Sequence, residues 1–129
     1  MGFDDLAEEL ERLGQIDRYA PRILGAAAPI LEKSLKEIVK EEADAGYATG
    51  ALVRSIKANR PSKNKYGHYV AVTARGTDAK GIRNNEKLAY LNYGTQRQAA
   101  RPVIARAVRN AEDECLEAIQ NEFDEVMNQ

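Results

Sequence analysis

The sequence predicts an α+β fold, with a small antiparallel β-sheet of three to four strands packed against long N-terminal and C-terminal helices. Apolar residues recur at steps of three and four near both ends of the chain, as in helices, and alternate with polar residues in the middle, as in strands. Short connections rich in Gly, Pro and Asn favour antiparallel pairing of these strands. The 129 residues suit a single domain, 1–129, with helices over 1–46, a sheet with mobile loops over 47–100 and a helix over 101–129.

Two helices are predicted before residue 46. The first is short and amphipathic, has acidic residues at its start, and ends at Gly14. Its apolar positions are Phe3, Leu6, Leu10 and Leu13. The second extends from about Pro21 to Ala45, and Gly46 is its expected C-terminal cap. Pro29 lies inside this helix and lacks a backbone donor, so we expect a kink or a break into two helices near Ala28.

The middle of the chain predicts three strands. Thr49 and Gly50 form a turn that caps one helical turn, after which Ile56 and Ala58 alternate with polar residues. The stretch "HYVAVTAR" also alternates, and "PSKNKYG" between the two is turn material, so we expect a β-hairpin. "KLAYLNYG" is predicted as a third strand, reached through the polar and mobile connection "GTDAKGIRNNE".

A long amphipathic helix is predicted from Pro102, which suits the first helical position, to near the C-terminus. Its expected apolar face consists of Ile104, Val108, Ala111, Cys115, Ile119, Phe123 and Val126. The charges of this helix oppose its dipole, which favours acidic residues at the start and basic residues at the end. Here the first turns carry Arg101, Arg106 and Arg109, and the last turns carry Glu122, Asp124 and Glu125.

No group of residues in the sequence is suited to catalysis. His68 is the only histidine and Cys115 the only cysteine, so the usual zinc ligand sets are missing. "GTDAKG" and "GYATG" match neither a phosphate-binding P-loop nor a dinucleotide fingerprint. We therefore expect a protein that is not an enzyme and has no cofactor or metal. No apolar run approaches the roughly 18 residues of a membrane span, so we expect a soluble protein.

The formal net charge of −1 conceals a strong segregation of charge along the chain. Residues 1–46 carry 6 basic and 11 acidic side chains, residues 47–109 carry 13 and 2, and residues 110–129 carry 0 and 7. Three interpretations of this pattern stay open. The basic and acidic parts neutralise each other within one monomer, or they join neighbouring copies head to tail in a ring, or the basic block makes non-specific contacts to DNA phosphates.

The stretch "YLNYGTQRQAARP" is the strongest candidate for an interaction site. Its segment from Gln96 to Arg101 is polar and basic, and it is held between a predicted strand and a helix that starts at a proline. Loops mounted on rigid elements in this way commonly carry binding contacts.

Two sets of motifs follow one another along the chain. The first, in "TGALVRSI", is Thr49, Gly50, Leu52, Arg54, Ser55 and Ile56. The second, before and at the start of the last helix, is Tyr90, Tyr93, Gly94, Thr95, Ala100, Arg101 and Pro102. In this order they resemble the gene-product-ten-like family of tail-completion or head-to-tail joining proteins of long-tailed bacteriophages. The resemblance covers about Pro21 to the end of the chain. The chain departs from the family at Asn92, where an acidic residue is usual, and at Val103, where Phe is frequent.

The resemblance implies a non-enzymatic virion protein of a phage or prophage, located in the tail or neck and in the host cytoplasm during assembly. Its implied partners are its own copies in a ring, the head–tail connector and the tail-tube proteins, with DNA nearby. The expected contact residues are Thr95, Gln96, Arg97 and Arg101, with Lys80 and Arg83 from the polar connection. Thr49, Gly50, Tyr90, Gly94 and Pro102 are the expected structural motif positions. The alternative function is a small nucleic-acid-binding module that uses the basic central block.

Overall fold

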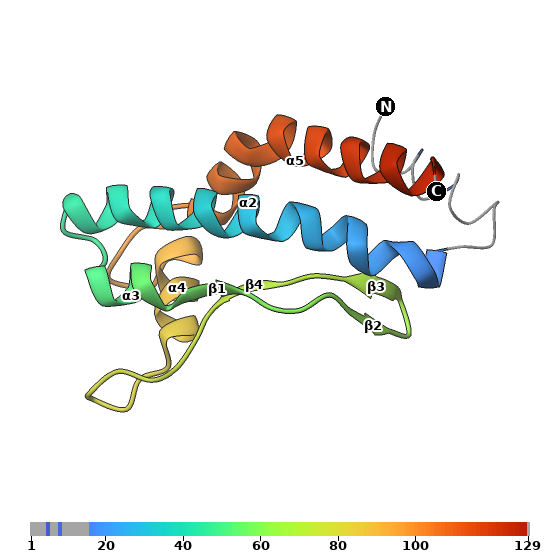
Figure 1. Cartoon of the computed structure of the whole chain (residues 1–129). Coiled ribbons are helices and arrows are strands. Elements are labelled where there is room, and N and C mark those ends of the chain that lie inside the picture. The colour runs from blue at the N-terminus through green and yellow to red at the C-terminus, as the bar shows by residue number, and fades with distance from the viewer. Residues whose placement is uncertain (1–4, 6–7, 9–15, 129) are drawn as a thin grey trace.

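The computed structural model describes residues 5, 8 and 16–128, and it confirms the α+β class (Figure 1). Two long helices, α2 (Ile16–Asp44) and α5 (Val103–Met127), pack against each other, and a narrow antiparallel hairpin packs against the other side of α2. The expected helix from Phe3 to Leu13 lies outside the described residues apart from Asp5 and Glu8, which are helical.

Helix α2 is continuous through both of its prolines, so the expected break into two helices is wrong. A proline ring normally clashes with the carbonyl four residues earlier. The helix nevertheless continues past Pro29 to Asp44. The expected cap is confirmed: Gly46 has a φ of +90°, its N–H donates to Ala43, and the Tyr47 N–H donates to the Glu42 carbonyl.

The short helix α3 (Gly50–Ser55) leads directly into the hairpin. The Oγ1 of Thr49 accepts a hydrogen bond from the Leu52 N–H at 3.1 Å, so the predicted cap is confirmed. Strand β1 (Ile56–Ala58) pairs with β4 (Val72–Ala74), and β2 (Ser62–Asn64) pairs with β3 (Gly67–Tyr69), all antiparallel. The expected strand "HYVAVTAR" is thus divided in two, and the segment expected to be only a turn forms the far end of the hairpin.

The predicted third strand is wrong, because Asn84–Tyr93 form the helix α4. Its buried residues, Leu88, Leu91 and Asn92, stand at the helical spacing of three and four. The side-chain oxygen of Asn92 accepts a hydrogen bond from the Ile104 N–H at 3.0 Å, which ties α4 to the start of α5. The sheet therefore consists of the hairpin strands alone within residues 16–128, and the element after it is helical.

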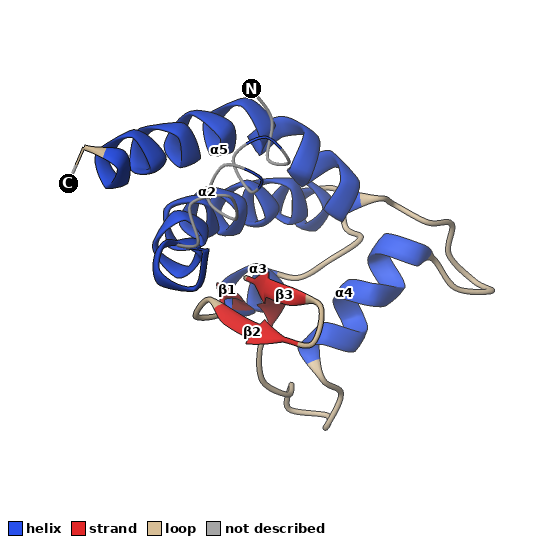
Figure 2. Ribbon diagram, turned by 90° about the vertical axis from the view of Figure 1, so that its right-hand side faces the viewer, coloured by secondary structure: helices blue, strands red, loops and turns tan. Residues whose placement is uncertain are grey.

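Helix α5 begins after Pro102, as predicted, but its buried face differs in the first two turns. Val103 and Ala107 are buried there, whereas Ile104 and Val108 are exposed by 38% and 51%. From Ala111 to Val126 the predicted face is confirmed, and it packs on Tyr19, Ile23 and Ala27 of α2. A second apolar cluster joins the C-terminal half of α2 to α3, β1, β4, α4 and the start of α5. Figures 1 and 2 show the resulting layers, with α2 between α5 and the hairpin.

Candidate functional site

The candidate loop after α4 is closed by its own hydrogen bonds. The Oγ1 of Thr95 accepts from the N–H groups of Arg97 and Gln98, both at 3.2 Å, and the Arg101 N–H donates to the Leu91 carbonyl at 2.9 Å. Figure 2 shows this loop extending away from the helices on the right. Gln96 and Arg97 are exposed, and the Arg97 side chain has no partner within residues 16–128. The structure therefore presents Arg97 at the surface, as the sequence predicts.

Gly94 gives the loop its sharp departure from α4. It has a φ of +83°, and a Cβ there would lie 2.7 Å from the Ala100 nitrogen and 3.0 Å from the Gln98 oxygen. We expect Gly94→Ala to lower the free energy of unfolding by about 1–2 kcal/mol for the left-handed backbone, with the clash in addition. Urea denaturation followed by circular dichroism measures the free energy of unfolding of Gly94→Ala and of the wild-type protein. Gly81→Ala is the matched control, because Gly81 has a φ of +85° but no atom within 4 Å; equal losses in the two variants would contradict the clash.

Arg101, a predicted contact residue, is partly exposed and has partners within the chain. Its guanidinium hydrogen-bonds to the carboxylate of Glu42 and lies 3.8 Å from the centre of the Tyr47 ring. Arg106 donates to the same carboxylate at 2.7 Å and pairs with Glu41 at 2.9 Å. Burial alone would raise the pKa of Glu42, but the hydrogen bonds from Arg106 and Arg101 outweigh it and hold this pKa below its ordinary value.

These contacts explain the reversed charges of α5. The basic start of α5 lies against the acidic end of α2, so the two unfavourable helix ends compensate each other inside the chain. At the opposite end of the α2–α5 helix pair, Arg22 of α2 forms ion pairs with Glu122 and Glu125 of α5. The interpretation that the basic block and the acidic parts neutralise each other within one monomer therefore holds at the start of α5, whereas Arg22, the partner at its C-terminal end, lies outside the basic block.

His68 also has a structural partner. Its Nε2 lies 2.8 Å from the carboxylate of Asp17, which the Lys63 ammonium contacts at 2.7 Å. The hydrogen bonds from Lys63 and His68 lower the pKa of Asp17. This cluster fastens the far end of the hairpin to the start of α2.

The connection after β4, which the sequence predicts as a polar loop, forms a turn with its own hydrogen bonds. The carboxylate of Asp78 accepts from the N–H groups of Lys80 and Ile82 at 2.8 and 2.9 Å and pairs with Lys87. The hydrogen bonds from Lys87 and from the backbone lower the pKa of Asp78 to about 2. Of the two predicted contact residues here, Lys80 is exposed without an ion pair within the described residues, and Arg83 pairs with Glu86.

After these pairings, several exposed charges lack an ion pair within residues 16–128, among them Lys33 and Glu37 of α2 and Arg109 of α5. Two groups of the unpaired charges share one sign and one region of the fold. The cationic face lies on α3 and the hairpin and consists of Arg54, Lys57, Arg60, Lys65 and Arg75. The anionic face lies on α5 and consists of Glu112, Asp113, Glu114 and Glu117. Which charges of the chain stay unpaired depends on the tertiary fold, so the sequence alone does not separate these two faces from the paired charges.

The two faces lie in opposite outer layers of the molecule. Lys57 follows buried Ile56 and Arg75 follows buried Ala74, so both point to the side of the hairpin away from α2. Asp113 stands two residues after buried Ala111, on the side of α5 away from α2. Because α2 lies between these layers, the two faces cannot pair within one molecule (Figures 1 and 2).

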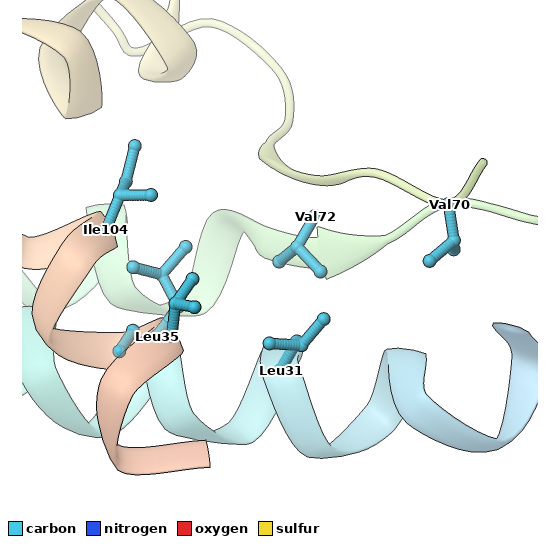
Figure 3. A pocket seen from close by; sticks show the side chains of 7 residues that line it. Leu31, Leu35, Val70, Val72 and Ile104 are labelled. Carbon is cyan, nitrogen blue, oxygen red and sulfur yellow. The ribbon is translucent and has the colours of Figure 1, made fainter. Parts of the chain in front are cut away.

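An apolar groove opens between α2, α5 and the hairpin. Figure 3 shows Leu31 and Leu35 on its floor, with Ile104 and Val72 on either side and Val70 further along the chain segment that precedes β4. Val108 and Ala107 complete the lining, and the volume is about 190 Å³. The sequence did not predict this groove, since it placed Ile104 and Val108 on the buried face of α5. A second hollow of about 270 Å³ lies between α3, α4 and the loop, lined in part by Tyr47, Tyr90 and Lys87.

The described part of the chain contains no cluster of three or more His, Cys, Asp or Glu side chains able to hold a metal ion. Cys115 is buried, and burial together with the charge of Glu114 raises the pKa of its thiol, which makes the reactive thiolate scarcer. Among the described helices, none combines the length and the apolar character that crossing a bilayer requires.

Comparison of the chain with models of protein families, with curated proteins and with solved structures finds no match. The candidate site is therefore defined by its own chemistry: a projecting loop with Arg97, two opposite charged faces and an apolar groove.

Proposed function

We propose that this chain is a structural virion protein of a phage or prophage that acts at the head–tail junction, in tail completion or head-to-tail joining. In this role its copies assemble into a ring that contacts the connector and the tail-tube proteins. The observation that carries the proposal is the placement of the cationic and anionic faces on opposite sides of one molecule.

Opposite, complementary faces favour head-to-tail contacts between copies. A contact that uses two different faces repeats from copy to copy, and it closes into a ring when the rotation between subunits allows it. Association through exposed charges is also steered electrostatically and weakens with salt. The motif resemblance supports the same role, and the loop with Arg97 is available for the neighbouring virion proteins.

The alternative, a nucleic-acid-binding module, would use the cationic face for phosphate contacts. Sedimentation velocity over a concentration series, with and without duplex DNA at low and physiological salt, separates the two. We expect oligomers that grow with protein concentration, appear as rings in negative-stain electron microscopy and form without DNA. A protein that stays monomeric throughout contradicts the ring, and salt-sensitive co-sedimentation with DNA by such a monomer favours the alternative.

A further inference from the structure

We infer that the apolar groove receives the hairpin tip of a second copy of this chain, with Tyr66 as the inserted side chain. This inference rests on the proposed ring assembly and adds to it the apolar contact that exposed charges alone do not provide. The proposed contact uses neither the loop with Arg97 nor most of the two charged faces. The exceptions are Lys65 of the cationic face and Glu112 of the anionic face.

Tyr66 is suited to insertion by its exposure and by the rigidity of its turn. Its side chain is exposed by 86%, the largest fraction among the large apolar residues of the described chain. Asn64 and Gly67 pair across the two-residue turn, and the side chain of Asn64 accepts a hydrogen bond from the Tyr66 N–H at 2.8 Å. These contacts fix the backbone of the turn, so less ordering of the backbone is needed on binding, and tyrosine is enriched at the centres of interfaces.

The groove is suited to one side chain rather than to a metabolite. Its volume of about 190 Å³ is below the roughly 300 Å³ at which small-molecule pockets begin. All seven of its lining residues are apolar, and no charged or hydrogen-bonding side chain enters it. An aromatic ring from a protein partner matches both the size and the chemistry.

A molecule cannot fill its own groove with its own tip. Contacts of Lys63 and His68 to Asp17 hold the tip at the start of α2, whereas the groove floor begins at Leu31. The helix between Asp17 and Leu31 spans about 21 Å at 1.5 Å per residue. In Figure 1 the β2–β3 turn likewise lies at the opposite end of the molecule from α3, α4 and the start of α5. The occupant is therefore a second copy, and the contact is head to tail.

Charge complementarity supports this choice of occupant. Lys65 precedes Tyr66 in the turn, and its ammonium has no carboxylate partner within the described residues. On the receiving side, Glu112 stands one helical turn beyond Val108 on α5 and lacks an ion pair within the described residues, as does Arg109, which directly follows Val108. Insertion of Tyr66 beside Val108 would bring Lys65 toward Glu112.

Disulfide trapping tests the contact directly. A Tyr66→Cys, Val108→Cys double variant should give a ladder of covalent multimers under mild oxidation, because every copy then carries both halves of the contact. Each single variant should give no ladder. The matched control is Tyr93→Cys, Val108→Cys, in which the exposed Tyr93 of α4 replaces the hairpin tip and no ladder is expected. Buried Cys115 is present in all of them.

Substitution supplies the second measurement. Tyr66→Ser and Val108→Glu each change an exposed side chain, so the fold should be kept, and each should weaken self-association about 30-fold in sedimentation. Suppose that the wild-type protein forms oligomers, but the Tyr66→Cys, Val108→Cys variant gives no ladder and Tyr66→Ser associates normally. The insertion of Tyr66 into the groove is then wrong, while the ring proposal stands. A wild-type protein that never associates overturns both. Trapped dimers without higher multimers overturn the head-to-tail arrangement.

Discussion

Replacement of Glu42 by alanine should lower the free energy of unfolding by about 3 kcal/mol. The carboxylate of Glu42 is buried, with a side-chain exposure of 4%, and it accepts hydrogen bonds from both Arg101 and Arg106. Its removal leaves two guanidinium groups without their shared partner, and an uncompensated charge costs more than the ion pair itself contributes. Both arginines are about one-third exposed, so water partly relieves this penalty and the loss falls at the low end of the usual range. Urea denaturation at neutral pH measures the change.

Glu41→Ala is the matched control for Glu42. Glu41 is the adjacent residue and also pairs with Arg106, but its side chain is 61% exposed. Exposed ion pairs contribute little, so this variant should change the free energy of unfolding by about 0.5 kcal/mol or less. Similar losses in the two variants would contradict the view that Glu42 joins the end of α2 to the start of α5.

Ile119→Ala should destabilise the protein by about 3 kcal/mol, because it removes a fully buried side chain between α5 and α2. Val108→Ala, on the same helix, should change stability by about 0.5 kcal/mol or less, since Val108 is half exposed at the groove. Parallel urea titrations of the two variants test both values. A large loss in Val108→Ala would mean that the buried face passes through Val108 and that the groove is filled within one molecule.

The parts of the fold that the sequence predicts correctly depend on local chemistry. The caps at Thr49 and Gly46 require only neighbouring backbone groups, so their residue types suffice. The apolar face of α5 from Ala111 onward follows from helical periodicity alone. The hairpin pairing of Ile56 and Ala58 with the strand around Val72 follows from alternation.

The helix α4 shows where local patterns fail. "KLAYLNYG" has apolar residues at five of eight positions, so it satisfies both strand and helix periodicity, and a short apolar run cannot separate the two. The spacing of Leu88, Leu91 and Asn92 by three and four residues is the signal that favours a helix. The helix also begins earlier than the predicted strand, at Asn84, in the segment expected to be a loop. The packing of these residues against α3, β4 and α5 decides between the two structures.

The candidate site needs tertiary information for a different reason. Arg101 and Glu42 are far apart in the sequence, so their pairing cannot be inferred from local spacing. The same holds for the groove, whose lining comes from α2, β4, α5 and the residue Val70 before β4. The sequence shows that basic and acidic residues are segregated along the chain. Only the fold shows which of these charges form ion pairs and which remain unpaired on the two faces.

The central claim is that the cationic face of one copy binds the anionic face of the next. Two charge-reversed variants test it: Glu112→Lys, Asp113→Lys, Glu117→Lys on α5, and Arg54→Glu, Lys57→Glu, Arg60→Glu on α3 and the hairpin. All six side chains are exposed, so both variants should fold.

Each variant alone carries like charges on its two faces and should sediment as a monomer. An equimolar mixture restores complementary faces between the two variants and should regain the oligomers of the wild-type protein. Oligomers of either variant alone, or a mixture that stays monomeric while the wild-type protein assembles, would contradict the claim.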